Sequence, residues 1–148
     1  MLTDKNVESI KWMRVCMLAY DRAEREGNEE HMEIARQRII DARQDGFKVS
    51  RGENAAIHAY CAEERGLGEM VVVNDFGMAD DANDLLYAFE RLGVKEFIVM
   101  DSSTALMEWL TNVLTHGWWI DGVETVPANR HVGGRFGADR RGLRLKKL

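Results

Sequence analysis

The segment VVVNDFGMADDANDLL, which begins at Val71, contains a turn that could hold an anion. Its three valines predict a strand, and a helical pattern of apolar residues follows from Ala79. Where a strand passes through such a turn into a helix, several backbone N–H groups stay unpaired, and the positive end of the helix dipole lies behind them. Such groups bind phosphate without side chains, and Gly77 would let a ligand approach the backbone closely. The turn at residues 74–79 is therefore either a cradle for a phosphate-bearing cofactor or only a tight corner.

Two aspartates bear on that choice. Asp80 and Asp81 follow the turn directly. Their carboxylates would repel a pyrophosphate, whereas they would stabilise the N-terminus of a helix that holds no ligand. This pair favours the tight corner over the cradle.

Three further residues could carry acid–base chemistry. Glu63 and Glu64 could deprotonate an amine, although two carboxylates in a polar stretch are also typical of a solvated turn. His116 stands near the end of a helical pattern, where it could donate a proton or only complement the helix dipole. The chain thus offers a candidate base and a candidate acid.

The sequence lacks the common metal and nucleotide motifs. Its four histidines show no ligand spacing and Cys16 and Cys61 form no CxxC, so we predict no metal site and two reduced core thiols. No Gly-x-Ser-x-Gly elbow, Walker loop or dinucleotide fingerprint occurs. Asp75 and Asp101 each follow a predicted strand and could form an acidic magnesium-binding pair, but Asp101 is equally explained as a helix cap.

Apolar residues at helical and strand spacing predict the elements that would position these groups. Residues 5–26 and 28–46 form an amphipathic helical hairpin, interrupted at Gly27 and capped by Asn28. The other predicted elements are strands at 69–73, 95–100, 118–126 and 142–148 and helices at 79–92 and 101–117. The last strand is predicted to lie at an edge of the sheet, because its lysines and arginine would then face water.

Residues 53–65 have two interpretations. Phe47–Val49 and residues 55–61 could pair as a β-hairpin. Ser50 and Glu53 have capping-box spacing and the segment is rich in alanine, which would instead give a helix. We favour the hairpin, and the segment stays open between strand and helix.

These elements predict a single α+β domain over residues 1–148, with a layered α/β arrangement in which a mixed sheet is flanked by helices. Its length of 148 residues and apolar content of 45% suffice for one core. Trp118 and Trp119 are adjacent and cannot both point inward from one strand, so one of them should form a pocket wall or a subunit contact.

The turn and the order of elements resemble the GCN5-related N-acetyltransferases (GNAT). That family's acetyl-CoA loop follows the pattern Gln/Arg-x-x-Gly-x-Gly/Ala, and Asn74, Gly77 and Ala79 occupy its three positions, with Asn in place of Gln or Arg. The course of the predicted elements also follows the family, including a late helix that ends in Gly117-Trp118 and two closing strands. The resemblance spans residues 5–148.

This resemblance implies a GNAT-like mixed sheet and an acetyl-CoA-dependent N-acetyltransferase that acts on an unidentified amine. Its cofactor-binding residues would be Asn74, Phe76, Gly77, Met78 and Ala79. The amine would enter near Glu63, Glu64 and His116. The family's usual first strand is not evident before Lys5, and the tyrosine acid of its last helix is missing, so His116 would take that role.

Charge is distributed unevenly along the chain. The net charge is −5, yet from Ala128 onward seven lysines and arginines stand against one acid. This basic C-terminal segment, residues 128–148, could bind nucleic acid or an acidic partner, or it could lie back on the acidic body. Its arginines are Arg130, Arg135, Arg140, Arg141 and Arg144.

Two other functions stay open. A catalytically inactive relative of the acetyltransferases could serve as a binding or structural protein, for example in a phage assembly, through the basic segment and an exposed tryptophan. A nucleic-acid-associated protein could contact phosphates through the same arginines. A homo-oligomer is compatible with each of them.

The sequence also bears on location. No apolar run reaches the roughly 18 residues of a membrane span, and the chain does not open with the pattern of a secretory signal. We therefore expect a cytosolic protein, or a virion protein if a phage encodes it.

Overall fold

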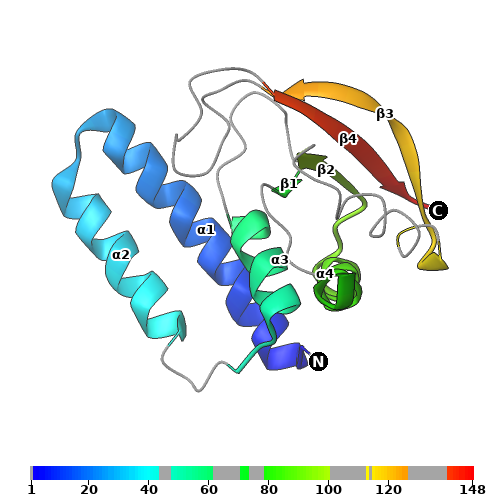
Figure 1. The fold of residues 1–148 in the computed structure, drawn as a ribbon. Coiled ribbons are helices and arrows are strands. Elements are labelled where there is room, and N and C mark those ends of the chain that lie inside the picture. Colours follow the sequence, from blue (N-terminus) through cyan, green and yellow to red (C-terminus); the bar gives the residue numbers. More distant parts are fainter. Residues whose placement is uncertain are drawn as a thin grey trace.

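The computed structural model describes residues 2–43, 48–61, 71–73, 79–100, 113, 115–126 and 140–148. At residues 71–73, 79–81, 100, 124, 126 and 140 it describes the backbone alone. Within these parts the chain forms four helices and one four-stranded sheet (Figure 1). This mixed content confirms the predicted α+β class.

Helices α1 (Asp4–Glu26) and α2 (Glu29–Arg43) form the predicted N-terminal hairpin. Gly27 ends α1 in the left-handed conformation, with φ at 68°, which glycine adopts without a steric cost. Asn28 then caps α2, because its side-chain oxygen accepts a hydrogen bond from the His31 N–H at 3.1 Å. Local turn chemistry therefore sets the reversal between the two helices.

Helix α3 (Arg51–Cys61) occupies the segment for which the β-hairpin was favoured, so that prediction is wrong. Ser50 and Glu53 form the capping box: the Ser50 N–H donates to Glu53 Oε1 at 2.9 Å, and the Glu53 N–H donates to Ser50 Oγ at 3.2 Å. The buried apolar side chains of α3 recur at helical spacing and include Ala56, Ile57, Tyr60 and Cys61. Capping and helical burial together outweigh the alternation that suggested a strand. The rest of the ambiguous segment, residues 62–65, lies outside the described residues.

The described strands have the order β1-β2-β4-β3. β1 (Val71–Val73) runs parallel to β2 (Glu96–Met100), and α4 (Ala79–Leu92) lies between them in the chain. β4 (Arg140–Lys147) is antiparallel to β2 on one side and to β3 (Trp118–Val126) on the other. The residue bounds of each of these elements agree with the sequence prediction to within two residues.

The pairing of β3 with β4 contains one irregularity. The register shifts between Ile120 and Gly122, and Gly122 has a φ of 153°. A β-bulge bends a strand locally, and a glycine inside a strand often marks such a site.

β4 is an inner strand, which corrects the prediction of an edge strand. Its Leu145 is fully buried. Its alternate residues Arg144 and Lys146 meet Asp121 of β3, at 3.4 and 3.0 Å. A charged strand face therefore does not require an edge, because an acid on the neighbouring strand offsets the positive charges.

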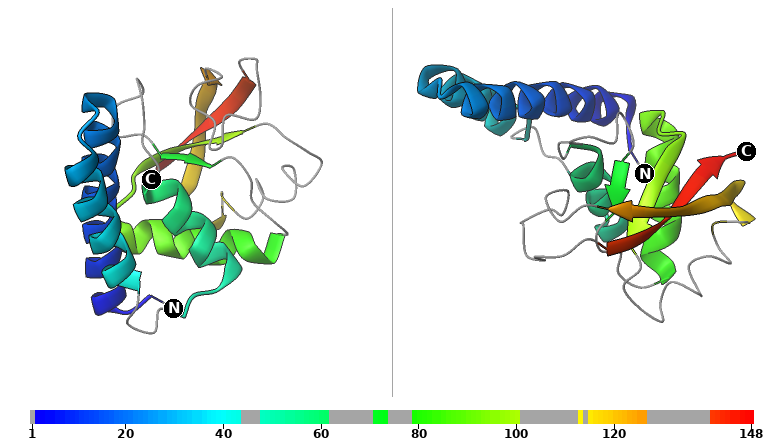
Figure 2. Two further views of the ribbon diagram at one scale, coloured as in Figure 1. Left: turned by 90° about the vertical axis from the view of Figure 1, so that its left-hand side faces the viewer. Right: turned by 90° about the horizontal axis from the view of Figure 1, so that it is seen from above.

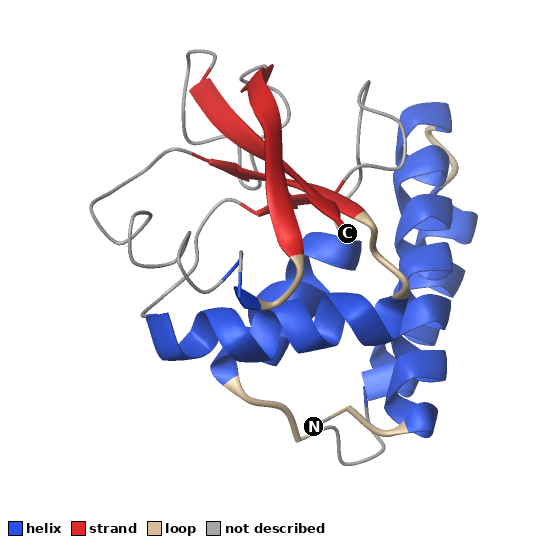
Figure 3. Cartoon of the chain, turned by 90° about the vertical axis from the view of Figure 1, so that its right-hand side faces the viewer, coloured by secondary structure: helices blue, strands red, loops and turns tan. Residues whose placement is uncertain are grey.

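The core lies between the sheet and the helices α3 and α4. Phe97 of β2 is fully buried, and its ring centre lies 5.0 Å from that of Phe89 in α4 and 4.9 Å from that of Trp118 in β3. Figure 3 shows α3 and α4 on one side of the sheet. These contacts fix the position of α4 relative to β2 and β3.

The helical hairpin extends beyond this body, as the right-hand view of Figure 2 shows. Val7, Ile10 and Met13, in the N-terminal half of α1, belong to the main core. Cys16 and Ala35 are buried outside that core. The hairpin is thus anchored at one end.

Candidate functional site at helix α4

His116 is the predicted acid–base residue that the structure describes. It ends a helical turn, and its N–H donates to the Val113 carbonyl at 3.2 Å. Gly117 follows with φ at 81°, so the chain can reverse into β3. The Gly117 carbonyl accepts the Leu148 N–H at 2.8 Å, which ties this turn to the end of β4.

The His116 ring lies against two side chains of α4. Its Nε2 is 3.0 Å from Oδ1 of Asn83. An amide oxygen only accepts hydrogen bonds, so in this arrangement Nε2 carries a proton and donates it. Tyr87 packs against the imidazole edge to face, with ring centres 5.0 Å apart and an interplanar angle of 79°. These two contacts orient the imidazole and leave Nδ1 as the nitrogen able to exchange a proton with a ligand.

Lys147 adds a positive charge to this cluster. Its Nζ donates to the His116 carbonyl at 3.0 Å and lies 5.4 Å from the centre of the Trp118 ring. The same nitrogen is 4.0 Å from a carboxylate oxygen of Glu90. The site cluster, defined as Asn83, Tyr87, Glu90, His116 and Lys147, therefore combines an imidazole, a phenol, a cation and a carboxylate.

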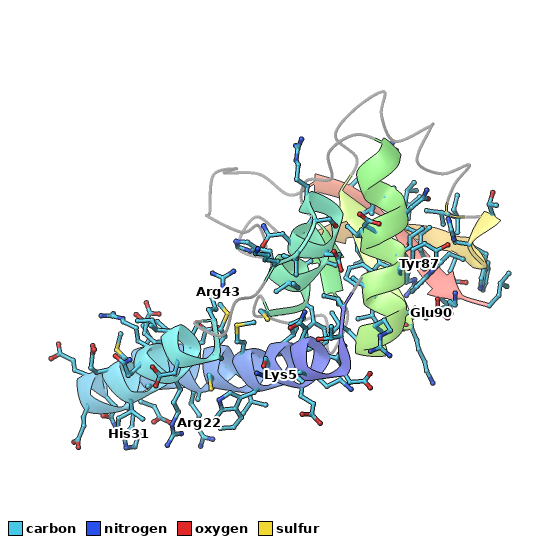
Figure 4. All side chains as sticks on the ribbon, turned by 90° about the horizontal axis from the view of Figure 1, so that it is seen from below. Lys5, Arg22, His31, Arg43, Tyr87 and Glu90 are labelled. Atoms are coloured by element: carbon cyan, nitrogen blue, oxygen red, sulfur yellow. The ribbon has the colours of Figure 1, made fainter. Side chains whose placement is uncertain are left out.

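Helix α4 presents three members of the cluster because of their spacing. Asn83, Tyr87 and Glu90 recur at intervals of four and three residues, which places them on one face of a helix. Figure 4 labels Tyr87 and Glu90 on the same side of α4. These three residues are not among the predicted site residues, although a helical projection of residues 79–92 separates this polar stripe from the apolar one.

One member of the cluster, Asn83, lies near the start of α4. Asn83 is four residues from Ala79, the first residue of the helix, and four residues rise about 6 Å along an α-helix. Because β1 and β2 are parallel, β1 ends at the carboxyl edge of this pair of strands, and α4 is the next described element of the chain. His116 is thus brought close to the helix that follows the predicted phosphate turn.

The other predicted site residues are not placed. Asn74, Phe76, Gly77 and Met78 lie outside the described residues, as do Glu63 and Glu64. Ala79 is described in its backbone alone. Of the predicted site residues, the structure therefore describes His116 and the backbone of Ala79. They are connected because His116 contacts Asn83 in the helix that begins at Ala79.

A cavity of about 270 Å³ has Tyr87 in its lining. It is lined by Leu2 and by residues of α3 and α4, and its charged lining residues are Glu53, Asp84 and Arg91. Two of these three side chains are carboxylates, which suit a positively charged amine better than an anion.

The basic C-terminal segment is partly described. Arg130 and Arg135 lie outside the described residues, Arg140 is described in its backbone alone, and Arg141 is exposed. Arg144 pairs with Asp121. Lys146 donates to Asp121 and also pairs with Glu96 at 3.3 Å, and these partners raise the pKa of Lys146. The described end of this segment therefore lies back on the acidic body.

The adjacent tryptophans point in different directions. Trp118 is 1% exposed and contacts Phe97, whereas Trp119 is 38% exposed. This confirms the prediction that only one of the two can point inward.

Both cysteines are free and buried, as predicted for core thiols. Burial raises the pKa of Cys61 to about 11, and its Sγ lies 3.8 Å from the Ile10 carbonyl oxygen. Burial also raises the pKa of Cys16, and the positive charge of Arg38 offsets part of this increase. Because only a thiolate is a good nucleophile, neither cysteine is suited to covalent catalysis near neutral pH.

The described residues contain no group of three or more side chains suited to hold a metal ion. None of the helices in the described parts of the chain has both the length and the apolar character of a membrane span. No protein-family model, curated protein or solved structure matches the chain.

Proposed function

We propose that this protein is an acetyl-CoA-dependent N-acetyltransferase with a GNAT-like layered fold, acting on an amine. The observation that carries the proposal is the unit β1–α4–β2, in which the two strands are parallel neighbours. Open sheets of this kind bind ligands at the carboxyl edge of their strands, where a helix N-terminus supplies unpaired N–H groups. β1 ends at that edge, directly before the turn predicted from the sequence at residues 74–79. His116 contacts Asn83, which is about 6 Å along α4 from its first residue.

The order of elements after β1 supports the same proposal. α4, β2, the Gly117-Trp118 pair, β3 and β4 follow one another as the resemblance to acetyltransferases implies. Helix α3 removes the expected central hairpin from that resemblance. The proposal therefore rests on residues 71–148.

The role of His116 follows from its contacts with α4, and the role of Glu63 or Glu64 follows from the sequence alone. Bound acetyl-CoA would supply an acyl group already activated as a thioester. Backbone N–H groups near β1 would polarise the acyl carbonyl as the amine nitrogen bonds to the acyl carbon and the carbon–sulfur bond breaks. The imidazolium form of His116, with a proton on both ring nitrogens, would give its Nδ1 proton to the leaving thiolate. Glu63 or Glu64 would take the proton from the attacking amine. Asp84, which lines the cavity beside Tyr87, would attract the amine in its charged form before that step.

The second candidate is a catalytically inactive relative that serves as a binding or structural protein, as in a phage assembly. Two observations favour it: Trp119 is exposed on β3, and Nε2 of His116 is already engaged by Asn83. A nucleic-acid function draws less support, because Arg144 and Lys146 pair with acids of the body.

Acetyl-CoA should raise the melting temperature of the full chain. A ligand at about 100 times its dissociation constant adds roughly 2.7 kcal/mol to the free energy of unfolding, which corresponds to about 5–10 °C for a chain of this size. Differential scanning fluorimetry with acetyl-CoA, and with ATP as a phosphate-bearing control, measures this shift. An unchanged melting temperature with acetyl-CoA at about 1 mM would contradict the acetyltransferase proposal and favour the binding or structural function.

A further inference from the structure

The hairpin of α1 and α2 carries a groove that the proposed function does not use. The groove has a volume of about 500 Å³ and is lined from both helices, including Trp12, Val15 and Ala19 of α1 and Ile34, Ala35 and Arg38 of α2. Figure 4 shows Arg22 and His31, which also line it, on the side of the hairpin away from α3 and α4. No described residue outside the hairpin lines the groove.

The groove exposes large apolar side chains to solvent. Trp12, Val15 and Ile34 are 46%, 54% and 43% exposed, while Cys16 and Ala35 beneath them are buried. Contiguous apolar surface of this kind on a folded chain is typical of an interaction site. A partner would have to cover two helices that run side by side.

The shape of the groove suits a second copy of the same hairpin. Trp12 lies toward the anchored end of α1, and Ala19 lies about two helical turns nearer the tip at Gly27. Small residues at the middle of a helix face let two backbones approach closely, and large ones at either end can enclose the partner. A two-fold axis near Ala19 would pack each Trp12 against the tip half of the other copy.

The two halves of the hairpin carry opposite net charges. The tip half, residues 19–34, has six acidic and two basic side chains, a net charge of −4. The base half, residues 4–18 and 35–43, has three acidic and six basic side chains, a net charge of +3. Of the charged side chains, Arg22 and Glu26 in the tip half and Arg38 in the base half line the groove itself. Two antiparallel copies can place Glu26 of one copy beside Arg38 of the other, whereas parallel copies place the two Arg38 side chains together.

The area of the α1–α2 face determines how strongly two copies are expected to associate. α2 has 15 residues and is therefore about 22 Å long, and two adjacent helices are about 20 Å wide. Such a face covers roughly 440 Å² of each copy, about half of the roughly 800 Å² per partner in a standard interface. The association should be weak, concentration-dependent and sensitive to salt.

We propose that this groove is the interface of a homodimer in which two α1–α2 hairpins pack antiparallel. The interface does not depend on the acetyltransferase proposal, since it involves neither α4 nor the site cluster. It gives the hairpin, which extends beyond the body, a packing partner for its apolar face.

Sedimentation equilibrium of the full chain tests the interface, with two matched variants. Ile34→Glu and Ile40→Glu change the same residue type on α2 at the same exposure of 43%, but Ile34 lines the groove and Ile40 does not. Between about 10 µM and 1 mM we expect the wild type and Ile40→Glu to pass from monomer to dimer, less readily at high salt, and Ile34→Glu to stay monomeric. A monomeric wild type at about 1 mM, or equal behaviour of the two variants, would overturn the proposal.

Disulfide cross-linking tests the antiparallel arrangement. Both native cysteines are buried, so a cysteine introduced on the hairpin reports its own contacts. Ala19→Cys, near the two-fold axis, should give a covalent dimer on mild oxidation, whereas Glu26→Cys, at the tip, should not. Cross-linking of Glu26→Cys at the same yield would overturn the antiparallel packing.

Discussion

Replacing Phe97 with alanine should lower the free energy of unfolding by about 3–5 kcal/mol. Phe97 is fully buried, and its ring packs against Phe89 and Trp118 at 5.0 and 4.9 Å. The variant loses the transfer free energy of the ring and leaves a cavity between α4 and the sheet that its neighbours cannot fill completely. This is a large part of the total stability of a small domain.

Urea denaturation followed by circular dichroism measures the effect of Phe97→Ala. Tyr87→Ala is the control, because it also removes an aromatic ring but from a side chain that is 52% exposed. We expect the control to cost about 1 kcal/mol or less. Similar midpoints for the two variants would mean that Phe97 does not occupy the centre of the core.

Replacing His116 with glutamine should reduce acetyl transfer by about 10²–10⁴-fold if the imidazole acts as the general acid. Glutamine keeps a polar side chain beside Asn83 but cannot hold and release a proton near neutral pH. The dissociation constant of acetyl-CoA should change little, since His116 is assigned to the chemical step. Release of CoA thiol from acetyl-CoA, with spermidine as the amine probe, measures the rate.

His58→Gln is the matched control for this experiment. His58 is exposed on α3 and is not part of the site cluster. Its variant should retain the wild-type rate. Equal rates for His116→Gln and His58→Gln would remove His116 from the chemistry and favour the inactive binding or structural protein.

The sequence predicts those parts of the fold that local signals determine. Gly27 and Asn28 fix the reversal of the helical hairpin, and each acts within one turn of its own position. The bend of β3 at Gly122 is likewise local. For such features the residue type alone limits the backbone conformation.

Two predictions about the fold are wrong. In one, local signals compete, and in the other, residues distant in the sequence determine the position of a strand. The capping box of Ser50 and Glu53 was recognised, but the alternation of residues 55–61 was given more weight than helical burial against α1 and α4. The inner position of β4 depends on Asp121 and Glu96, which lie far from Lys146 in the sequence. No local pattern reveals such a pairing.

The candidate site was predictable in part. His116 was identified by its residue type, and the strand–turn–helix course around Ala79 follows from apolar spacing. Asn83, Tyr87 and Lys147 were missed because their role comes from a contact between α4, the turn before β3 and the end of β4. Only the folded chain brings these three segments together.

Hydrogen–deuterium exchange with and without acetyl-CoA measures whether the start of α4 binds this ligand. Backbone amides in residues 74–83 should exchange more slowly when acetyl-CoA is bound, because the ligand would engage N–H groups at the helix N-terminus, and exchange in α2 should not change. Unchanged exchange in residues 74–83 at saturating acetyl-CoA would contradict binding at the start of α4.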